Sequence, residues 1–353
     1  MVILITGATH TGKTLLASRL IEKYKFPCTS IDHLKMGLIR SGNTALTPED
    51  DGDLTDYLWP VVREMIKTAI ENRQNLIVEG CYVPYDWRKD FDETYLADIR
   101  FICLAMTDEY IDANFDKIVA HASDIEARLD DSYCTAGTIK AINRELTEGF
   151  RRSGEQVTLI DGDYEEAIET LLKRLARTIP PFTVIPHLES NRITVRKLTV
   201  SDAEGLEELA HDEAVYRYLP TFLFEQKYDD TGTVIDRLYT ECLRESIIMG
   251  IFADGQFAGL IELYGHRAPI RKISVGYRLL RSFCGKGIAS EALGLLIRYL
   301  YEETDTEIVT ASTMVENRAS ANVLIKNGFS LVASAVPEDW GYEELTPADK
   351  WIR

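Results

Sequence analysis

The sequence is poor in positive charge relative to negative charge. Lysine and arginine number 39 against 57 aspartate and glutamate residues, so the formal net charge is 39 − 57 = −18. A protein that binds nucleic acid displaces counterions from phosphates with a cationic surface, and we therefore expect no nucleic-acid partner. A cationic acceptor molecule would instead be attracted by such a field.

Paired cysteines and long hydrophobic runs are also missing. None of the six cysteines stands in a Cys-x-x-Cys pair, so neither a zinc site nor a disulfide framework is predicted. No apolar stretch approaches the length of about 18 residues that a membrane span needs, and the N-terminus lacks the basic segment of a signal peptide. These absences favour a cytoplasmic protein with reduced thiols and no membrane partner. They leave the oligomeric state open.

The 353 residues suffice for two domains of ordinary size. In residues 1–178, apolar runs such as Ile99–Met106 alternate with segments of helical spacing, which predicts a parallel sheet with helices on both faces. Prolines then interrupt the pattern, and we place a linker over residues 179–190. Residues 191–353, with a helix expected at Ile288–Glu303, predict a mixed α/β domain with a mostly antiparallel central sheet.

A glycine-rich stretch follows the first apolar run. Gly7-Ala8-Thr9-His10-Thr11-Gly12-Lys13-Thr14 matches G-x-x-x-x-G-K-[ST] at every fixed position. In such a loop, backbone N–H groups turn inward on phosphate oxygens at the start of a helix. Lys13 would reach the β- and γ-phosphates of ATP, and the Thr14 hydroxyl would hold Mg²⁺. A turn without a ligand is the alternative. The candidate contacts are Gly7, His10, Thr11, Gly12, Lys13 and Thr14.

Residues 1–178 resemble small P-loop kinases of the adenylate kinase-like, shikimate kinase-like and chloramphenicol phosphotransferase-like kinds. The Gly7–Thr14 loop, Asp32 and the Ile77-Val78-Glu79-Gly80 stretch carry the resemblance. It implies that Asp32 takes the proton of a small hydroxyl-bearing acceptor and that Glu79 orients Mg²⁺ through water. It also implies a lid arginine over the transferred phosphate, for which Arg128 is the candidate. In the alternatives, Asp32 caps a helix, Glu79 is a solvated acid, and Arg128 is a surface residue.

A second glycine loop, Cys284-Gly285-Lys286-Gly287-Ile288-Ala289, opens the predicted helix that runs to Glu303. The predicted strand Ile273–Leu279 precedes this loop, and another predicted strand and helix follow the helix. This setting resembles the GNAT N-acetyltransferases, whose signature is [QR]-x-x-G-x-[GA], with Cys284 in place of the usual arginine or glutamine. The resemblance implies that backbone N–H groups wrap the pyrophosphate of acetyl-CoA and that Lys286 adds a cation. The candidate contacts are Gly285, Lys286, Gly287, Ile288 and Ala289.

The stretch from residue 317 to residue 329 resembles the ribosomal-protein-acetyltransferase-like branch of that family, through its Asn-x-x-Ser and Lys-x-Gly-Phe spacings. The resemblance implies that Asn317 and Ser320 are the candidates for cofactor contacts and proton transfer. Leu324 stands where many members carry a tyrosine that protonates the leaving thiolate. Asn317 and Ser320 could instead only cap a helix.

Acetyl transfer to an amine also needs a base and a proton donor. Glu262 and His266, in the predicted central sheet, are the candidate bases, and Tyr277 is a further candidate donor. A loop histidine and a packed strand tyrosine are the structural alternatives. The acceptor would be a small-molecule or protein amine.

Three functions therefore stay open. The first is a bifunctional enzyme, an acetyl-CoA-dependent acetyltransferase fused to an ATP- and Mg²⁺-dependent kinase-like domain. The second is an acetyltransferase gated by a nucleotide sensor that does not turn over. The third is an acyl-CoA-binding module without catalysis, since a fold does not settle a function.

Overall fold

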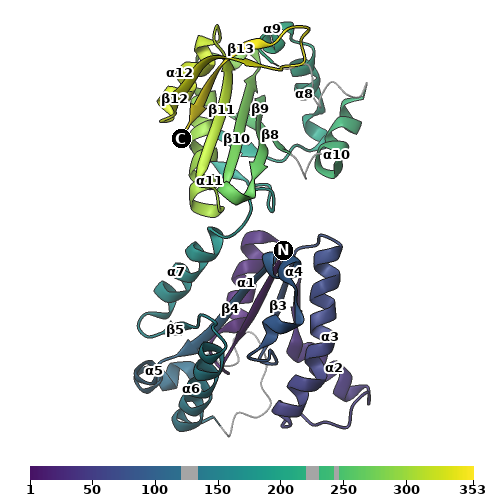
Figure 1. Cartoon of the computed structure of the whole chain (residues 1–353), viewed down its shortest axis with the longest axis vertical. Helices are drawn as coiled ribbons and strands as arrows, with labels where there is room; N and C mark the ends of the chain where they lie inside the picture. Colours follow the sequence, from purple (N-terminus) through teal and green to yellow (C-terminus); the bar gives the residue numbers. More distant parts are fainter. Residues whose placement is uncertain (121–133, 220–229, 242–245) are drawn as a thin grey trace. The chain divides into compact units, whose positions relative to one another are not determined.

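The computed structural model describes residues 1–120, 134–219, 230–241 and 246–353. Its contacts divide the chain into two compact units, Met1–Leu175 and Ala176–Arg353 (Figure 1). Part of the stretch predicted as a linker packs on the core of unit 2, through Phe182 and Ile185. Arg128, the candidate lid arginine, lies outside the described residues. Within the described ranges no helix is both long and apolar enough to cross a membrane.

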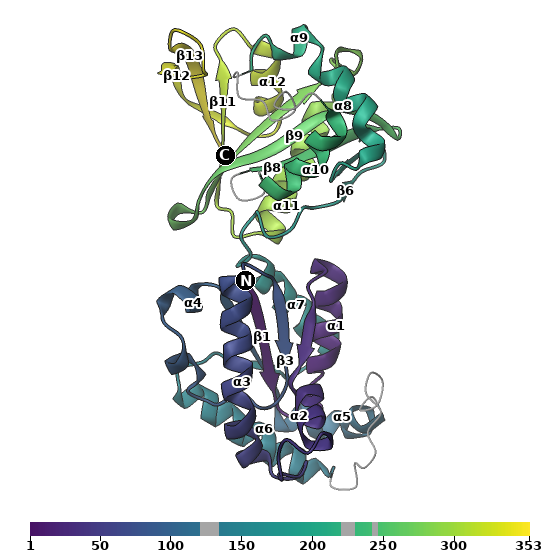
Figure 2. The ribbon, with the colours of Figure 1, turned by 90° about the vertical axis from the view of Figure 1, so that its right-hand side faces the viewer.

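Unit 1 is built on a parallel sheet of five strands in the order β2-β3-β1-β4-β5, which confirms the predicted parallel sheet. Figure 2 shows α1 and α3 on opposite sides of this sheet. The strands are β1 Val2–Gly7, β2 Cys28–Ser30, β3 Leu76–Glu79, β4 Ile99–Met106 and β5 Thr158–Ile160. The helices are α1 Lys13–Tyr24, α2 Ile31–Arg40, α3 Asp51–Glu71, α4 Glu93–Ala97, α5 Asp108–Ala120, α6 Ala136–Arg152 and α7 Tyr164–Ala176.

The core of unit 1 explains why its elements form where they do. Strand β1 is buried along its whole length, as expected for a central parallel strand covered on both faces. On α3, buried apolar residues recur at intervals of four and pack on Val2 and Leu4 of β1. These are Leu54, Leu58, Val62 and Ile66. This packing fixes β1, and with it the loop that follows β1.

Unit 2 contains a mixed sheet of eight strands in the order β12-β13-β11-β10-β9-β8-β7-β6. Only the β10–β11 pair is parallel, so the predicted mostly antiparallel sheet is confirmed. The strands are β6 Leu188–Glu189, β7 Ile193–Arg196, β8 Ser246–Ala253, β9 Gln256–Arg267, β10 Lys272–Leu279, β11 Ile308–Met314, β12 Ser330–Glu338 and β13 Thr346–Ile352. The helices are α8 Ala203–Ala210, α9 Glu213–Tyr216, α10 Thr231–Glu241, α11 Ile288–Glu303 and α12 Arg318–Lys326.

Side chains on alternate positions of the unit 2 strands serve two different cores. One face, with residues such as Leu263 and Val275, packs under α11. The opposite face, with Ile248 and Leu260, packs against α8 and α10. Between Leu260 and Tyr264 on β9, and along β10, alternate positions therefore serve opposite faces.

The sheet opens between β10 and β11. The two strands pair only from Lys272 to Ser274, opposite Ile308 to Thr310. Beyond that point β10 stays paired with β9 as far as Leu279, and β11 stays paired with β13. The remaining part of β10 has therefore lost its neighbour on the β11 side, which leaves an opening in the middle of the sheet.

Candidate functional site

The loop before α11 leaves the first N–H groups of that helix without a side-chain partner. Gly287 is the N-cap residue, its φ is 81°, and the helix has no side-chain cap among the described residues. Gly285 also has a left-handed backbone, with φ of 74°. Left-handed glycines before an uncapped helix N-terminus are the backbone geometry from which anion-binding concavities are built. The Lys286 ammonium lies 5.5 Å above the ring of Phe283.

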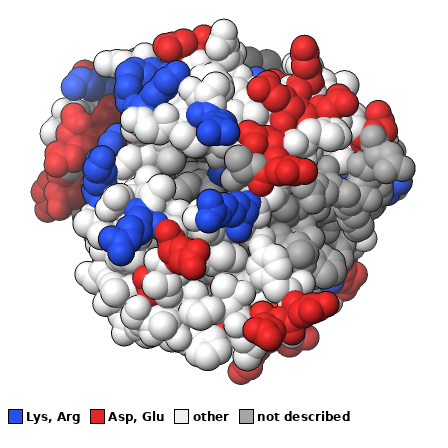
Figure 3. Space-filling view, turned by 90° about the horizontal axis from the view of Figure 1, so that it is seen from above, with Lys and Arg blue, Asp and Glu red and all other residues white. Residues whose placement is uncertain are grey.

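Cations gather at one end of unit 2 although the whole chain is acidic. Figure 3 views this unit from the end that is uppermost in Figure 1 and shows Lys and Arg side chains around a hollow. Acidic side chains cluster elsewhere on the same face. A local cationic rim suits a ligand that carries phosphate groups.

A tyrosine of β10 reaches the first turn of α12. The Tyr277 hydroxyl donates to the backbone oxygen of Ser320 at 3.0 Å and lies 2.9 Å from the Ser320 hydroxyl. Tyr277 belongs to the part of β10 that has lost its β11 neighbour, whereas Ser320 follows β11, so this contact joins the two sides of the opening. Burial raises the pKa of Tyr277 to about 12, and the phenol is therefore a neutral donor at pH 7.

Asn317 fixes Ser320 from the other side. It is the N-cap residue of α12, and its Oδ1 accepts a hydrogen bond of 3.1 Å from the backbone N–H of Ser320. Leu324 is completely buried and brings no polar group to this place. The structure thus gathers Asn317, Ser320 and Tyr277 in one hydrogen-bonded group, with Asn317 in the capping role.

The two candidate bases lie in different surroundings. Glu262, on β9 opposite Gly276, serves the face that packs against α8 and α10, and its side chain is 24% exposed. The ring of His266 instead packs against Phe182 of the core under α11, with ring centroids 5.7 Å apart. Its Nε2 is buried and has no hydrogen-bond partner in the described part of the chain. The structure therefore does not bring His266 to Glu262.

Polar side chains surround Glu262 on its face of the sheet. The carboxylate lies 3.4 Å from the guanidinium of Arg278, whose side chain is only 2% exposed. Desolvation raises the pKa of Tyr264, and the charges of Glu262 and Glu338 raise it further. Neither Arg278 nor Gly276 was predicted from the sequence as a site residue. An isolated glycine within an apolar strand pattern was the available signal, because it often marks a close approach.

In unit 1, the loop after β1 is folded tightly on itself. Gly12 is the N-cap residue of α1, with φ of 79° and no side-chain cap. The Lys13 ammonium and the Thr11 hydroxyl both donate to the backbone oxygen of Ala8, each at 2.8 Å. His10 also has a left-handed backbone, with φ of 64°. The candidate magnesium ligand Thr14 lies in the first turn of α1.

The candidate acids of unit 1 sit at the carboxyl ends of neighbouring strands. Glu79 ends β3 opposite Ser30 of β2, and it is 2% exposed, so it is not a solvated surface acid. Asp32 lies inside the first turn of α2 rather than at its N-cap, and it pairs with Lys35 at 3.0 Å. In the parts of the chain that the structure describes, no group of three or more His, Cys, Asp or Glu residues could hold a metal ion.

The topology of unit 1 also favours a ligand beside this loop. Strands β1 and β4 are neighbours, but the chain leaves β1 towards β2 and leaves β4 towards β5, in opposite directions. Ligands of open α/β sheets bind at such a switch point, outside the carboxyl ends of the strands.

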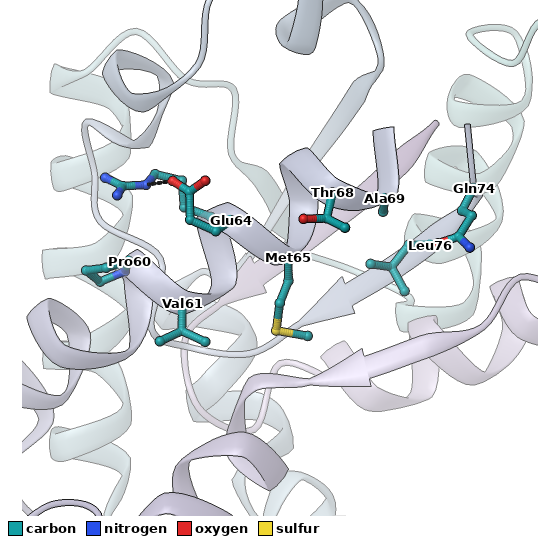
Figure 4. Close-up of a pocket in the computed structure, with 9 residues that line it drawn as sticks. Pro60, Val61, Glu64, Met65, Thr68, Ala69, Gln74 and Leu76 are labelled. Carbon is teal, nitrogen blue, oxygen red and sulfur yellow. Dashed lines mark hydrogen bonds and ion pairs between the residues drawn. The ribbon is translucent and has the colours of Figure 1, made fainter. Parts of the chain in front are cut away.

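A pocket of 680 Å³ lies away from this loop, between the outer face of α3 and the amino end of β3 (Figure 4). Its Glu64 is already paired with Arg63.

Comparison with known proteins identifies the family. Residues 192–330 match the family model described as "Acetyltransferase (GNAT) domain". "Probable N-acetyltransferase YjcK" of Bacillus subtilis (strain 168) is 32% identical over 159 residues, which cover 40% of this chain and 82% of that protein. The chain belongs to the GNAT acetyltransferases. "Putative ribosomal N-acetyltransferase YdaF" of the same organism is 29% identical over 147 residues, or 40% of this chain and 79% of that protein.

Solved structures include the RimL ribosomal L7/L12 alpha-N-protein acetyltransferase in complex with coenzyme A. It is 18% identical, with a TM-score of 0.43, and the alignment covers 48% of this chain and 97% of that one. The family match falls entirely within unit 2, and unit 1 lies outside it. The similarity to YdaF agrees with the predicted ribosomal-protein-acetyltransferase-like branch for the GNAT domain.

Proposed function

We propose that the GNAT domain transfers an acetyl group from acetyl-CoA to an amine. The opening between β10 and β11 carries this proposal, because it lies beside the Tyr277–Ser320 contact and leaves β10 backbone groups without β11 partners. The two left-handed glycines before α11 fit the pyrophosphate of acetyl-CoA, since no side chain occupies the free helix terminus. Acetyl-CoA supplies the acetyl group as a thioester.

The residues around the opening divide the proton chemistry between them. Glu262 accepts the proton that the acceptor amine loses as it attacks. On the other side, Tyr277 and Ser320 offer neutral hydroxyl donors towards the leaving sulfur. The Cys284 thiol is an unsuitable acyl carrier, because it lies in the loop proposed to hold the cofactor and partial desolvation there raises its pKa, which disfavours the thiolate. Transfer is therefore direct, within a ternary complex.

The acceptor that we propose is an amino group of a protein. The support is the similarity to YdaF, a ribosomal N-acetyltransferase by name, of which this chain covers 79%. A competition assay tests this choice: a short peptide with a free N-terminus and a polyamine are offered together, and the acetylated product is identified. Preferential acetylation of the polyamine would indicate a small-molecule acceptor instead.

For unit 1 we propose a P-loop kinase-like domain that binds ATP and Mg²⁺ and phosphorylates a small hydroxyl-bearing molecule. The loop from Gly7 to Thr14, the switch point beside it and the buried Glu79 support this proposal. Lys13 and the loop amides would hold the phosphates, and Thr14 with Glu79 would hold Mg²⁺. Asp32 would take the proton of the acceptor hydroxyl.

Calorimetric titration tests both proposals on the full chain. We expect acetyl-CoA and ATP·Mg²⁺ each to bind, and Lys13→Ala to weaken only ATP, by about 10-fold or more because a charge-assisted phosphate contact is lost. Lys23→Ala, which removes a lysine from the last turn of the same helix, is the matched control and should leave both affinities unchanged. ATP binding without phosphoryl transfer, together with altered acetylation, would favour a nucleotide sensor. No ATP binding would refute the proposal for unit 1.

A further inference from the structure

Gly276 stands in the middle of β10 without any need for glycine in its backbone. Gly276 is not among the residues with positive φ, and it lies inside the regular strand β10. A side chain is excluded because the volume above this position is already occupied. A Cβ built at Gly276 would lie 2.5 Å from Oε1 of Glu262, 3.0 Å from its Cγ and 3.2 Å from its Cδ. The carboxylate of Glu262 therefore occupies the volume that a side chain at position 276 would fill.

This arrangement places the Glu262 carboxylate at the opening in the sheet. Glu262 and Gly276 are directly paired across β9 and β10, so an ordinary side chain at 276 would stand beside that of Glu262. Because Gly276 has none, the glutamate carboxylate lies over β10 at this position. Beyond Ser274, β10 has no β11 partner.

Arg278 holds the carboxylate in this position. It lies two residues beyond Gly276 on the same face of β10, and its Nη1 is 3.4 Å from Oε2 of Glu262. Its side chain is 2% exposed, so water screens the attraction only weakly. On the β8 side, Glu262 is opposite Ile248, which belongs to the apolar core under α8 and α10 and offers no competing charge.

We infer that Gly276 and Arg278 are positioning residues that hold the Glu262 carboxylate over the part of β10 that has no β11 partner, beside the opening where the acceptor amine must meet the acetyl group. The inference rests on the proposed acetyl transfer. Gly276 provides the room, and Arg278 fixes the direction. Tyr277, between them, points to the other face and contacts Ser320, so three consecutive residues of one strand set the groups on both sides of the opening.

A double-mutant cycle tests this inference. Gly276→Ala should lower kcat for the best probe amine by about 10-fold or more, since a displaced general base loses much of its contribution of about 100-fold. In a Glu262→Ala background the added methyl group has room, and Gly276→Ala should change kcat by less than about 2-fold. The affinity for acetyl-CoA, measured by calorimetry, should stay unchanged in all four proteins.

Three further variants separate positioning from general damage. Arg278→Lys should retain more turnover than Arg278→Gln, because it keeps a cation near the carboxylate. Relative to the protein with Arg278, both substitutions should shift the kcat–pH profile when Glu262 is present and leave it unchanged in the Glu262→Ala background. Gly250→Ala is the matched control, since a Cβ there would meet the apolar side chains of Leu198 and Phe252, each at 2.6 Å. It should lower the melting temperature of unit 2 without changing the shape of the pH profile.

The outcomes distinguish the inference from the function on which it rests. Equal kcat losses from Gly276→Ala with and without Glu262 would overturn the inference, even in an active enzyme. If the wild type acetylates none of the probe amines, the proposed function fails instead. The melting temperature then still tests the placement of Glu262 over Gly276: Gly276→Ala must lower it in the presence of Glu262 and leave it unchanged in the Glu262→Ala background. Any other pattern overturns the inference.

Discussion

Gly12, at the start of α1, allows a quantitative test of how the loop in unit 1 is built. Its backbone is left-handed, with φ of 79° and ψ of 27°, which costs an alanine roughly 1–2 kcal/mol. A Cβ there would also lie 2.0 Å from the hydroxyl oxygen of Tyr164, an overlap that costs about 1–3 kcal/mol. Gly12→Ala should therefore destabilise unit 1 by about 2–5 kcal/mol.

Tyr164→Phe separates these two contributions. The Tyr164 hydroxyl is buried and has no hydrogen-bond partner among the described residues, so its removal alone should be neutral or stabilise unit 1 by up to about 1 kcal/mol. In the Gly12→Ala background the same change removes the nearest clashing atom and leaves the ring carbon Cζ at 2.9 Å. It should recover about 1–2 kcal/mol and leave the cost of the backbone conformation.

Differential scanning calorimetry of the full chain is the suitable assay, because two units need not unfold in one transition. Only the transition of unit 1 should move. Tyr95→Phe is the control, since that hydroxyl bonds to Glu71 at 2.6 Å on the surface and should not rescue Gly12→Ala. The reasoning is refuted if Tyr164→Phe recovers nothing, or if it destabilises the otherwise unchanged protein by more than about 1 kcal/mol.

Three more predictions concern unit 2. Tyr277→Phe should lower kcat about 10-fold or more with little change in the KM for acetyl-CoA, because the phenol orients Ser320. Steady-state kinetics measures both constants, and a raised KM with an unchanged kcat would contradict this prediction. Burial raises the pKa of Tyr239 to about 12, above the ordinary value of about 10. The neutral phenol is thus favoured in the fold, and stability should fall as pH rises from about 10 to 12, less steeply in Tyr239→Phe, as followed by circular dichroism. Burial of Asp202 opposes its ionisation, but bonds from Arg196 at 2.8 and 2.9 Å, with others, hold its pKa below the usual range. Stability should therefore be lost as pH falls below about 4, and Asp202→Asn should be less sensitive to acid in urea titrations.

Elements with a strong local pattern were predictable from the sequence. The predicted strand Ile99–Met106 and the predicted helix Ile288–Glu303 are observed with these bounds, because their apolar spacing alone distinguishes them. Strand β13, Thr346–Ile352, was not predicted, since it contains proline and two charged residues. It forms because β11 and β12 pair with it from both sides, which is a tertiary cause that no local pattern reports.

The same distinction holds for the candidate site. Asn317 and Ser320 are three residues apart and their contact could be expected from that spacing. The contact between Tyr277 and Ser320 joins residues 43 apart, and the place of Glu262 over Gly276 depends on the pairing of two strands. His266 and Glu262 are only four residues apart in one strand, yet a register shift near Lys272 and the packing on Phe182 separate them. Register, rather than sequence distance, decides which of these residues meet.

The two glycine loops of the chain share one backbone geometry, and the proposed functions assign binding to the loops and chemistry to the side chains around them. Gly12 and Gly287 both end their loops as left-handed N-cap residues, with φ of 79° and 81°, and neither helix terminus carries a side-chain cap. The backbone N–H groups of such a terminus can bind a phosphate but carry out no bond-making step themselves. Variants at these glycines should therefore change ligand affinity and local stability, whereas variants at Glu262 or Ser320 should change turnover at constant affinity. If binding and chemistry reside in different residues, as we propose, a variant of either unit can keep its ligand while losing its reaction, and the two properties must be measured separately in each unit.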